Sequence, residues 1–482
     1  MAKLKNIIKQ LSTRDYKAIH DSLLESNADK SAYLIQAMRE RQLSDTKIML
    51  ELEVNTNAYY TLRSRLNQKI EEYLLQQMES PRTDILKKVA NINEIIFTKK
   101  RAIAVATLKK LEKELLDYDL SNELTIVYKS LKKLHINSPD YYSYSQLYNR
   151  HVAYMLAVDK SEDLLAEYFK KYGNYSLSGD ETDKLGLTLL LKEMYNVSVL
   201  YESHRLYVYY SCMVIFHRLF VDQQDSMDED NEPIEDILEN VQKIFNSYQL
   251  DSIYYHLNLV FEFLKFEYYT HYRVFRKAER FYEEVNDAAS NLLTNYTLYT
   301  YPAQFLATKM ERHIRIGNVR KVYEENEGIF HDFEIDKQDV PTYVTYTMYR
   351  AISCYYVEKY DEASKWINNL LNEISLKKFP FMQLEIKIVL ALQYCLMNDY
   401  DLFNQLINSI QRQIRLLGKE NCEHILLLSK IMKVSISDIK RNKVDKIKSL
   451  IEKTESVKID HFSPTALIRL DEDFISRLST QP

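Results

Sequence analysis

Glycine and proline are scarce in this sequence, with six glycines and eight prolines among 482 residues. Average proteins contain about 7% glycine and about 5% proline. Because tight connections between strands need these residues, the shortage excludes a β-sandwich, a β-barrel and a propeller. It also leaves almost no glycine for phosphate-binding loops. The 46% hydrophobic and 28% charged residues instead predict a globular chain with a large core.

Cysteine is rare as well. The four cysteines lie far apart in apolar stretches and form no CxxC pair, which excludes a redox motif and a zinc knuckle of that type. Lys3, Lys5 and Lys9 stand where a signal peptide needs its apolar stretch. The apolar run from Val208 to Phe216 contains Ser211 and is too short to span a bilayer. We therefore expect a cytoplasmic protein without membrane contact.

Apolar residues recur at every third or fourth position along nearly the whole chain, as at Tyr59, Leu62 and Leu66. This spacing predicts amphipathic helices, and we find no convincing alternating strand pattern. An acidic stretch with few apolar residues predicts a loop or linker. The expected organisation is all-α, in five parts: an N-terminal helical domain at 1–135, a middle helical segment at 136–221, the acidic linker at 222–234, helical repeats at 235–455 and a C-terminal tail at 456–482.

A repeat follows the acidic stretch. Pro302, Pro341 and Pro380 lie 39 residues apart, and each precedes the apolar pattern of a helix. Proline is tolerated there because the first helical turn has no partner for its missing N–H. A short turn and a second amphipathic helix follow each one. The second helices align at these apolar positions, with an earlier copy last: Val319 and Val322, Tyr360 and Ala363, Tyr400 and Phe403, Phe275 and Ala278. Helix pairs at this spacing are typical of an α-solenoid.

One of these pairs resembles a known family. In Ala351–Leu371, AISCYYVEKYDEASKWINNLL, a small residue, an aromatic residue and a tight turn precede Tyr360-Asp361-Glu362-Ala363, which is similar to the centre of a tetratricopeptide repeat. The chain departs from that family in its 39-residue period and in lacking the Trp-x-x-Leu-Gly opening. The resemblance extends over about 250–418. It implies a solenoid of helical hairpins with a scaffold role.

Motifs for catalysis are missing from the sequence. It contains no HExxH, GxxxxGK[ST], GxSxG, GxGxxG or EF-hand pattern. No histidine follows a glutamate by three positions, as the di-iron sites of helical bundles require. We therefore predict a protein that is not an enzyme and has no metal or other cofactor. An enzyme with a dispersed site near His151 and His204 is the weakest of three hypotheses.

A second hypothesis, DNA binding, comes from residues 43–66, LSDTKIMLELEVNTNAYYTLRSRL, which resemble a helix-turn-helix. Met49 and Glu53 stand at tight positions where that family prefers Ala and Gly. The resemblance implies that Arg63 and Arg65 contact phosphates. An ordinary helical hairpin is the simpler interpretation, and we favour it by about five to one.

The charge distribution limits any such binding. Residues 1–140 contain 24 Lys and Arg against 19 Asp and Glu, while the rest of the chain contains 40 against 50. A slightly basic block supplies few uncompensated cations, so we expect nucleic-acid binding to be weak, salt-sensitive and without sequence preference.

Two polar clusters interrupt apolar helices, and they are candidates for an anion or carboxylate site if their helices are neighbours. A buried hydrogen-bond network or solvated helix ends explain them more simply. The clusters consist of Asn149, Arg150 and His151, and of Asn196, His204 and Arg205.

Tyrosine is unusually frequent, with 39 residues. Tyr343, Tyr346 and Tyr349 step by three and share one face of the helix that Pro341 begins. In tetratricopeptide repeats this helix lines the concave surface, so we predict a partner-binding groove at these tyrosines and Arg350. Most tyrosines must still be core residues. The leading hypothesis is a non-catalytic scaffold that binds a protein or peptide. The alternative is a transcription regulator with an N-terminal helix-turn-helix-like DNA-binding segment and a tetratricopeptide-like region that senses a peptide or partner.

Overall fold

The computed structural model describes residues 4, 8, 11, 13–26, 28–41, 43, 45–77, 81–118, 120–201, 203–222, 232–248, 252–330, 333, 335–437, 443–455 and 462–479. Helices account for the regular structure of these residues, and no strand occurs among them. The predicted all-α class is therefore confirmed. The chain divides into two compact units, residues 1–151 and residues 152–482, and the long helix α10 (Asp140–Ser178) contains the division.

The N-terminal unit has two separate hydrophobic cores. Leu34, Ile35 and Leu66 belong to the first, and Leu108, Val127 and Leu131 belong to the second. The helices of this unit, before α10, are α2 (Thr13–Glu25), α3 (Asp29–Arg39), α4 (Asp45–Glu51), α5 (Thr56–Gln77), α6 (Pro81–Ala90), α7 (Ile92–Thr98), α8 (Arg101–Asp117) and α9 (Ser121–Leu134).

The turn between α4 and α5 has a well-defined conformation. Glu53 adopts a left-handed backbone with φ of 52°, which costs a residue with a Cβ about 1–2 kcal/mol. The Asn55 side chain then accepts a hydrogen bond from the backbone N–H of Ala58 at 2.9 Å and caps α5. The predicted order of helix, short turn and longer helix in residues 43–66 is therefore confirmed.

The C-terminal unit is built around one continuous core. Its helices after α10 are α11 (Glu181–Tyr201), α12 (His204–Phe220), α13 (Ile234–Ser247), α14 (Ser252–His271), α15 (Phe275–Asp287), α16 (Ala289–Asn295), α17 (Ala303–Ile316), α18 (Arg320–Phe330), α19 (Val340–Tyr356), α20 (Tyr360–Glu373), α21 (Pro380–Leu396), α22 (Tyr400–Leu417), η1 (Glu420–Cys422), α23 (Glu423–Ile436), α24 (Lys443–Glu455), η2 (Pro464–Leu467) and α25 (Glu472–Ser479).

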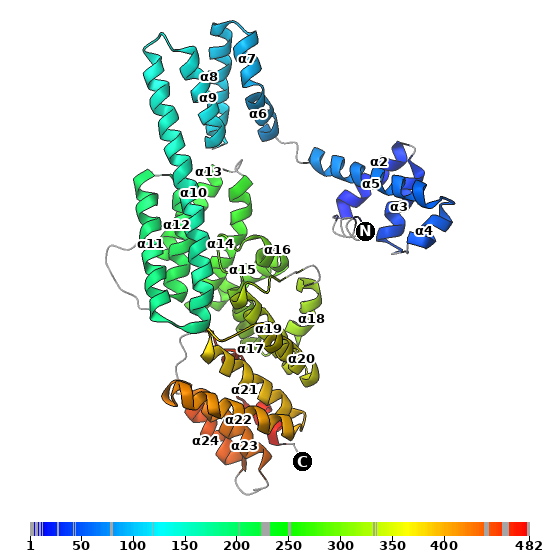
Figure 1. The fold of residues 1–482 in the computed structure, drawn as a ribbon, viewed down its shortest axis with the longest axis vertical. Coiled ribbons are helices and arrows are strands. Elements are labelled where there is room, and N and C mark those ends of the chain that lie inside the picture. The colour runs from blue at the N-terminus through cyan, green and yellow to red at the C-terminus, as the bar shows by residue number, and fades with distance from the viewer. Residues whose placement is uncertain are drawn as a thin grey trace. The chain divides into compact units, whose positions relative to one another are not determined.

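Helices of this unit pack as neighbouring pairs, which Figure 1 shows for α19 with α20 and for α21 with α22. Four pairs share one turn: a single left-handed residue between the two helices, at Arg273, Gly317, Glu358 and Asn398. In each turn the next residue donates its backbone N–H to a carbonyl five positions earlier, as from Lys359 to Cys354 at 3.0 Å. The pairs are thus related by local geometry as well as by spacing.

The prolines of the repeat stand where the sequence predicts them. Pro302 is the N-cap of α17, and Pro341 and Pro380 lie in the first turns of α19 and α21. The aligned positions Ala278, Val322, Ala363 and Phe403 of the second helices are all buried. The expected helical hairpins of this region are confirmed.

Most of the predicted acidic linker, residues 223–231, lies outside the described residues. The four cysteines are free and buried. In the part of the chain that the structure describes, none of the helices combines the length and the apolar character needed to cross a membrane.

Candidate functional site

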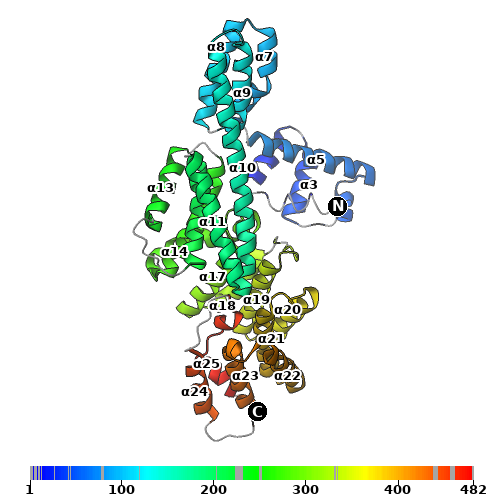
Figure 2. The same cartoon turned by 60° about the vertical axis from the view of Figure 1, so that its left-hand side comes forward.

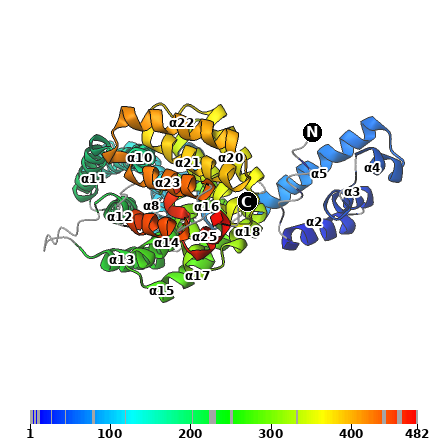
Figure 3. The same cartoon turned by 90° about the horizontal axis from the view of Figure 1, so that it is seen from below.

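A C-terminal segment lies against α17, α19 and α21, which are the first helices of three neighbouring helix pairs. Residues 462–479, which we call the C-terminal segment, comprise η2 and α25. The turn η2 contacts α17, α19 and α21, while α25 contacts α23 and α24. Figure 2 shows α23, α24 and α25 together, and Figure 3 shows α25 in red from below. We call the contacted side of α17, α19 and α21 the first-helix face.

Glu385 of α21 is the polar centre of this contact. Its completely buried side chain accepts hydrogen bonds through Oε2 from the hydroxyls of Ser463 at 2.8 Å and Thr465 at 2.7 Å, and from the backbone N–H of Thr465 at 3.2 Å. His424 of α23 pairs with Oε1. One carboxylate therefore joins two helices to the segment, and its charge is balanced by four donors.

These donors set the ionisation of Glu385. Burial by itself raises the pKa of a carboxyl, but the hydrogen bonds from His424, Thr465 and Ser463 outweigh it and hold the pKa of Glu385 below its ordinary value of 4.5. A carboxyl with a lower pKa in the folded state stabilises that state above its unfolded pKa and loses this contribution as the pH falls through the folded value.

We therefore expect the free energy of unfolding in urea to be insensitive to Glu385 between pH 7 and pH 5, and to fall with its protonation below about pH 4.5. The measurement compares the wild type with Glu385→Gln at several pH values, because other carboxylates contribute to both curves. The decrease should be smaller for Glu385→Gln. Parallel curves would show that folding does not lower the pKa of Glu385, and a wild type that loses stability relative to Glu385→Gln as the pH rises above 4.5 would show that the carboxyl is neutral in the folded protein.

Tyr356 of α19 binds the backbone of the segment. Its hydroxyl donates to the carbonyl of Leu467 at 2.9 Å and accepts from the N–H of Arg469 at 3.0 Å. The N–H of Phe462 also donates to the carbonyl of Ser176 in α10 at 2.9 Å. Such contacts hold the backbone of the segment irrespective of its side chains, and main-chain hydrogen bonds are one way in which peptide-binding surfaces supply affinity.

Apolar side chains complete the attachment. Leu467, Ile468, Phe474 and Leu478 of the segment are buried. The void between the segment and the helices below it is only about 10 Å³, and it is lined by Ile388, Val389, Leu392, Leu428, Met432, Thr465, Ile468 and Phe474. The interface is therefore closely packed and has almost no room for water.

The local sequence patterns do not predict this constellation. From those patterns residues 456–482 are expected to be a tail, and no role is expected for Tyr356, Glu385 or His424. One signal was present: Glu385 is an acidic residue within the strongly apolar segment PFMQLEIKIVLALQYC, and a buried carboxylate needs donors from elsewhere in the fold. The sequence does not indicate where those donors are.

The predicted groove tyrosines of α19 are buried. Tyr346, at 8% exposure, packs edge-on against Phe330 and Trp366 with ring centroids 4.9 and 6.1 Å away. Arg350 donates to the Tyr346 hydroxyl at 3.1 Å, and its guanidinium lies 4.7 Å from the Trp366 ring.

The two neighbouring tyrosines are enclosed as well. The Tyr343 hydroxyl donates to Glu373, and Tyr349 is almost completely buried. The structure thus places Tyr346, Tyr349 and Arg350 in a packed aromatic cluster with Phe330 and Trp366, while Tyr343 is buried beside them on α19. Whether they bind a partner stays a prediction, but their rings have the environment of core residues.

The two predicted polar clusters fall in different units. Asn149 and Arg150 are exposed, and the His151 ring lies 5.1 Å from the Tyr128 ring within the N-terminal unit. In the C-terminal unit, Asn196 is exposed, the His204 ring stacks on Tyr248 at 3.9 Å, and Arg205 lies 5.8 Å from the Tyr254 ring. Contacts with tyrosines account for both histidines, and an anion site stays a prediction.

A further buried polar group joins α15, α17 and α18. The completely buried Lys309 donates to Asn286 at 2.6 Å and pairs with Glu325. Burial lowers the pKa of Lys309, and burial also lowers the pKa of the neighbouring His313 to about 4, so this imidazole is neutral at pH 7. Because both groups are enclosed and partnered, they fit the role of internal ties between helices.

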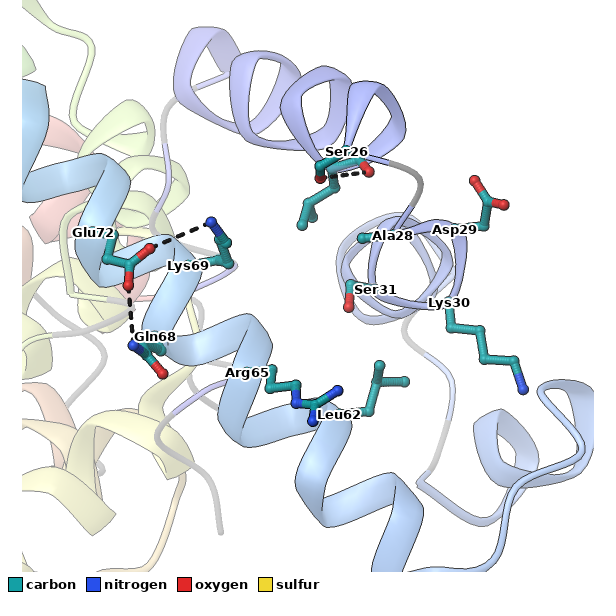
Figure 4. A pocket seen from close by; sticks show the side chains of 11 residues that line it. Ser26, Ala28, Asp29, Lys30, Ser31, Leu62, Arg65, Gln68, Lys69 and Glu72 are labelled. Atoms are coloured by element: carbon teal, nitrogen blue, oxygen red, sulfur yellow. Dashed lines mark hydrogen bonds and ion pairs between the residues drawn. The ribbon is translucent and has the colours of Figure 1, made fainter.

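The candidate phosphate contacts of the N-terminal unit differ from each other. Arg63 is 9% exposed and lies 5.8 Å from the Tyr59 ring, so it is largely covered by its own core. Arg65 is exposed and lines a groove of about 540 Å³. Figure 4 shows Arg65 on α5 facing Lys30 and Ser31 on α3 across this groove.

Comparison with protein-family models, with curated proteins and with solved structures finds no match to this chain. Within the described residues, no group of three or more His, Cys, Asp and Glu is placed to hold a metal ion. The site is therefore interpreted from its own geometry.

Proposed function

We propose that this protein is a helical-repeat scaffold that binds a short polypeptide segment on its first-helix face. The observation that carries the proposal is the C-terminal segment itself. Tyr356 holds the backbone of the segment, and Glu385 accepts hydrogen bonds from the hydroxyls of Ser463 and Thr465 in the segment. A surface that binds one such segment has the chemistry to bind another.

The finer architecture belongs to this proposal. Helix pairs with a shared turn and a spacing near 40 residues support a tetratricopeptide-like solenoid, in which stacked first helices form a concave surface. The first-helix face is then that surface. A basic residue in the bound segment also fits, because Arg477 donates to the carbonyl of Tyr355 and pairs with Glu358.

Cross-linking in the native cell, followed by mass spectrometry, tests the proposal. We expect cross-links to another protein to map onto α19 and α21 beside Tyr356 and Glu385. Leu392→Asp, which places a charge on the first-helix face, should abolish them. Leu402→Asp, at an exposed position of α22, is the matched control and should leave them intact. Cross-links confined to second helices or to the N-terminal unit would contradict the proposal.

A second candidate function is nucleic-acid binding by the N-terminal unit. It is supported by the left-handed Glu53, which provides the tight turn of a helix-turn-helix without glycine. Lys30, Arg65 and Lys69 line the adjacent groove. However, Asp29 and Glu72 line it too, and Glu72 pairs with Lys69 at 3.5 Å. This balance leaves little positive charge for phosphates.

For this second candidate we expect weak binding to a labelled DNA duplex that declines steeply between 50 and 200 mM NaCl. Arg65→Ala should reduce the salt slope by about 1. Arg101→Ala, an exposed cation on α8, is the control, and Arg63→Ala should lower stability instead. Fluorescence anisotropy measures the binding. Tight binding to one sequence at physiological salt would rank this function above the scaffold.

A further inference from the structure

The C-terminal segment is built differently from the helix pairs that it contacts. Ser463 and Ile468 are extended on either side of the four-residue turn η2. The polar contacts of residues 463–469 with α19 and α21 reach 78 to 113 positions back along the chain. The segment therefore lies across three first helices as a bound peptide would, and it does not continue the pairing of first and second helices.

The contacts also indicate which chemical groups the first-helix face binds. Glu385 Oε2 accepts from two hydroxyls that are two residues apart, and the N–H of Thr465 supplies a third donor. After one intervening residue, Ala466, come Leu467 and Ile468, which are both buried, and Ile468 lines the apolar void against α21 and α23. A vacated face would leave a carboxylate without three of its donors, which favours an occupant that restores them.

We propose that residues 462–479 are an intramolecular ligand of the first-helix face, and that the partner is a segment of the same chemistry, with a short turn like η2, that must displace them. Such a partner carries two hydroxyl side chains two positions apart and, after one further residue, two aliphatic residues, as in Ser463, Thr465, Leu467 and Ile468. This inference rests on the function proposed above and adds both the ligand class and the competition.

The expected strength of the competition between the tethered segment and an external partner follows from the effective concentration of the segment. A tethered segment acts at an effective concentration of about 1 mM when its linker is short and flexible. If the free peptide binds with a Kd of about 10 μM, the intact chain binds an external copy about 100-fold more weakly than a chain whose face is empty. The face is therefore available only to a strong or locally concentrated partner.

The experiment uses the whole chain with a protease recognition sequence between Glu455 and Phe462. Cleavage leaves all residues present but frees the segment to dissociate, and dilution with gel filtration then removes it. A fluorescent synthetic peptide of residues 462–479 is titrated into intact protein, cleaved protein and cleaved protein after removal of the segment. Circular dichroism at each stage reports whether the body remains folded.

We expect the emptied body to remain helical, to bind the labelled peptide at one site, and to bind it at least about 100-fold more tightly than the intact chain. In the peptide, Ser463→Ala with Thr465→Val should weaken binding by about 10- to 100-fold, because Glu385 loses two donors. Glu472→Gln, at a side chain that is 94% exposed, is the control peptide and should bind like the original.

The unfavourable outcomes separate the two proposals. A body that unfolds when the segment leaves, or an intact chain that binds the peptide as tightly as the emptied one, overturns the intramolecular ligand but leaves a binding role open. A folded, emptied body that does not bind the peptide overturns the first-helix face as a binding surface. A dimer of intact chains that exchange this segment would assign the occupant to a second copy and also overturn the inference.

Discussion

Glu385→Ala is expected to weaken the attachment of the C-terminal segment by about 3–5 kcal/mol, the usual cost of removing one member of a buried charged group. The substitution leaves the hydroxyls of Ser463 and Thr465 and the ring of His424 without their shared acceptor, and it also opens a cavity in α21. Hydrogen exchange of the amides in residues 465–478 should accelerate by at least about 100-fold.

Hydrogen exchange of the amides in α17 and α19 should change much less. Glu385 lies on α21, so its loss affects only one side of the packing of these two helices. Asp361→Ala is the control: this carboxylate of α20 is 70% exposed and pairs with Lys365 at 3.4 Å on the surface, and such pairs contribute at most about 1 kcal/mol. If Glu385→Ala left the exchange of the segment unchanged, the buried carboxylate would not be the group that holds it, and the first-helix face would have to be redefined around Tyr356.

Tyr346→Ala is expected to lower the free energy of unfolding by about 3 kcal/mol, because a large buried ring is removed from contact with Phe330, Phe333 and Trp366. Urea unfolding followed by the fluorescence of Trp366, the single tryptophan, measures the loss next to the altered position. A loss of this size identifies Tyr346 as a core residue of the α19–α20 hairpin.

Tyr346→Phe is the control for the hydroxyl. It keeps the ring and removes only the hydrogen bond from Arg350, so it should cost about 0.5–1.5 kcal/mol. A stability of Tyr346→Ala within about 1 kcal/mol of the wild type would show that the ring is solvated. In that case the predicted groove at Tyr343, Tyr346 and Tyr349 would regain its support as a binding surface.

Local patterns were sufficient to predict the helices and their pairing. The 39-residue spacing of Pro302, Pro341 and Pro380 locates the first helices because proline acts within a single helical turn. The helix, turn and helix of residues 43–66 are likewise encoded by neighbours, including the Asn55 cap. Each of these features depends on residues only a few positions apart, so it leaves a periodic signal in the sequence.

Tertiary structure decided which faces are core and where the candidate site lies. A tyrosine stripe with a step of three has the same pattern whether its face meets solvent or another helix, so only the packing of Phe330 and Trp366 against Tyr346 shows that these rings are buried. Glu385 meets its donors 78 and 80 residues further along the chain. Partnerships at that separation follow from how the helix pairs stack, and no local spacing encodes them.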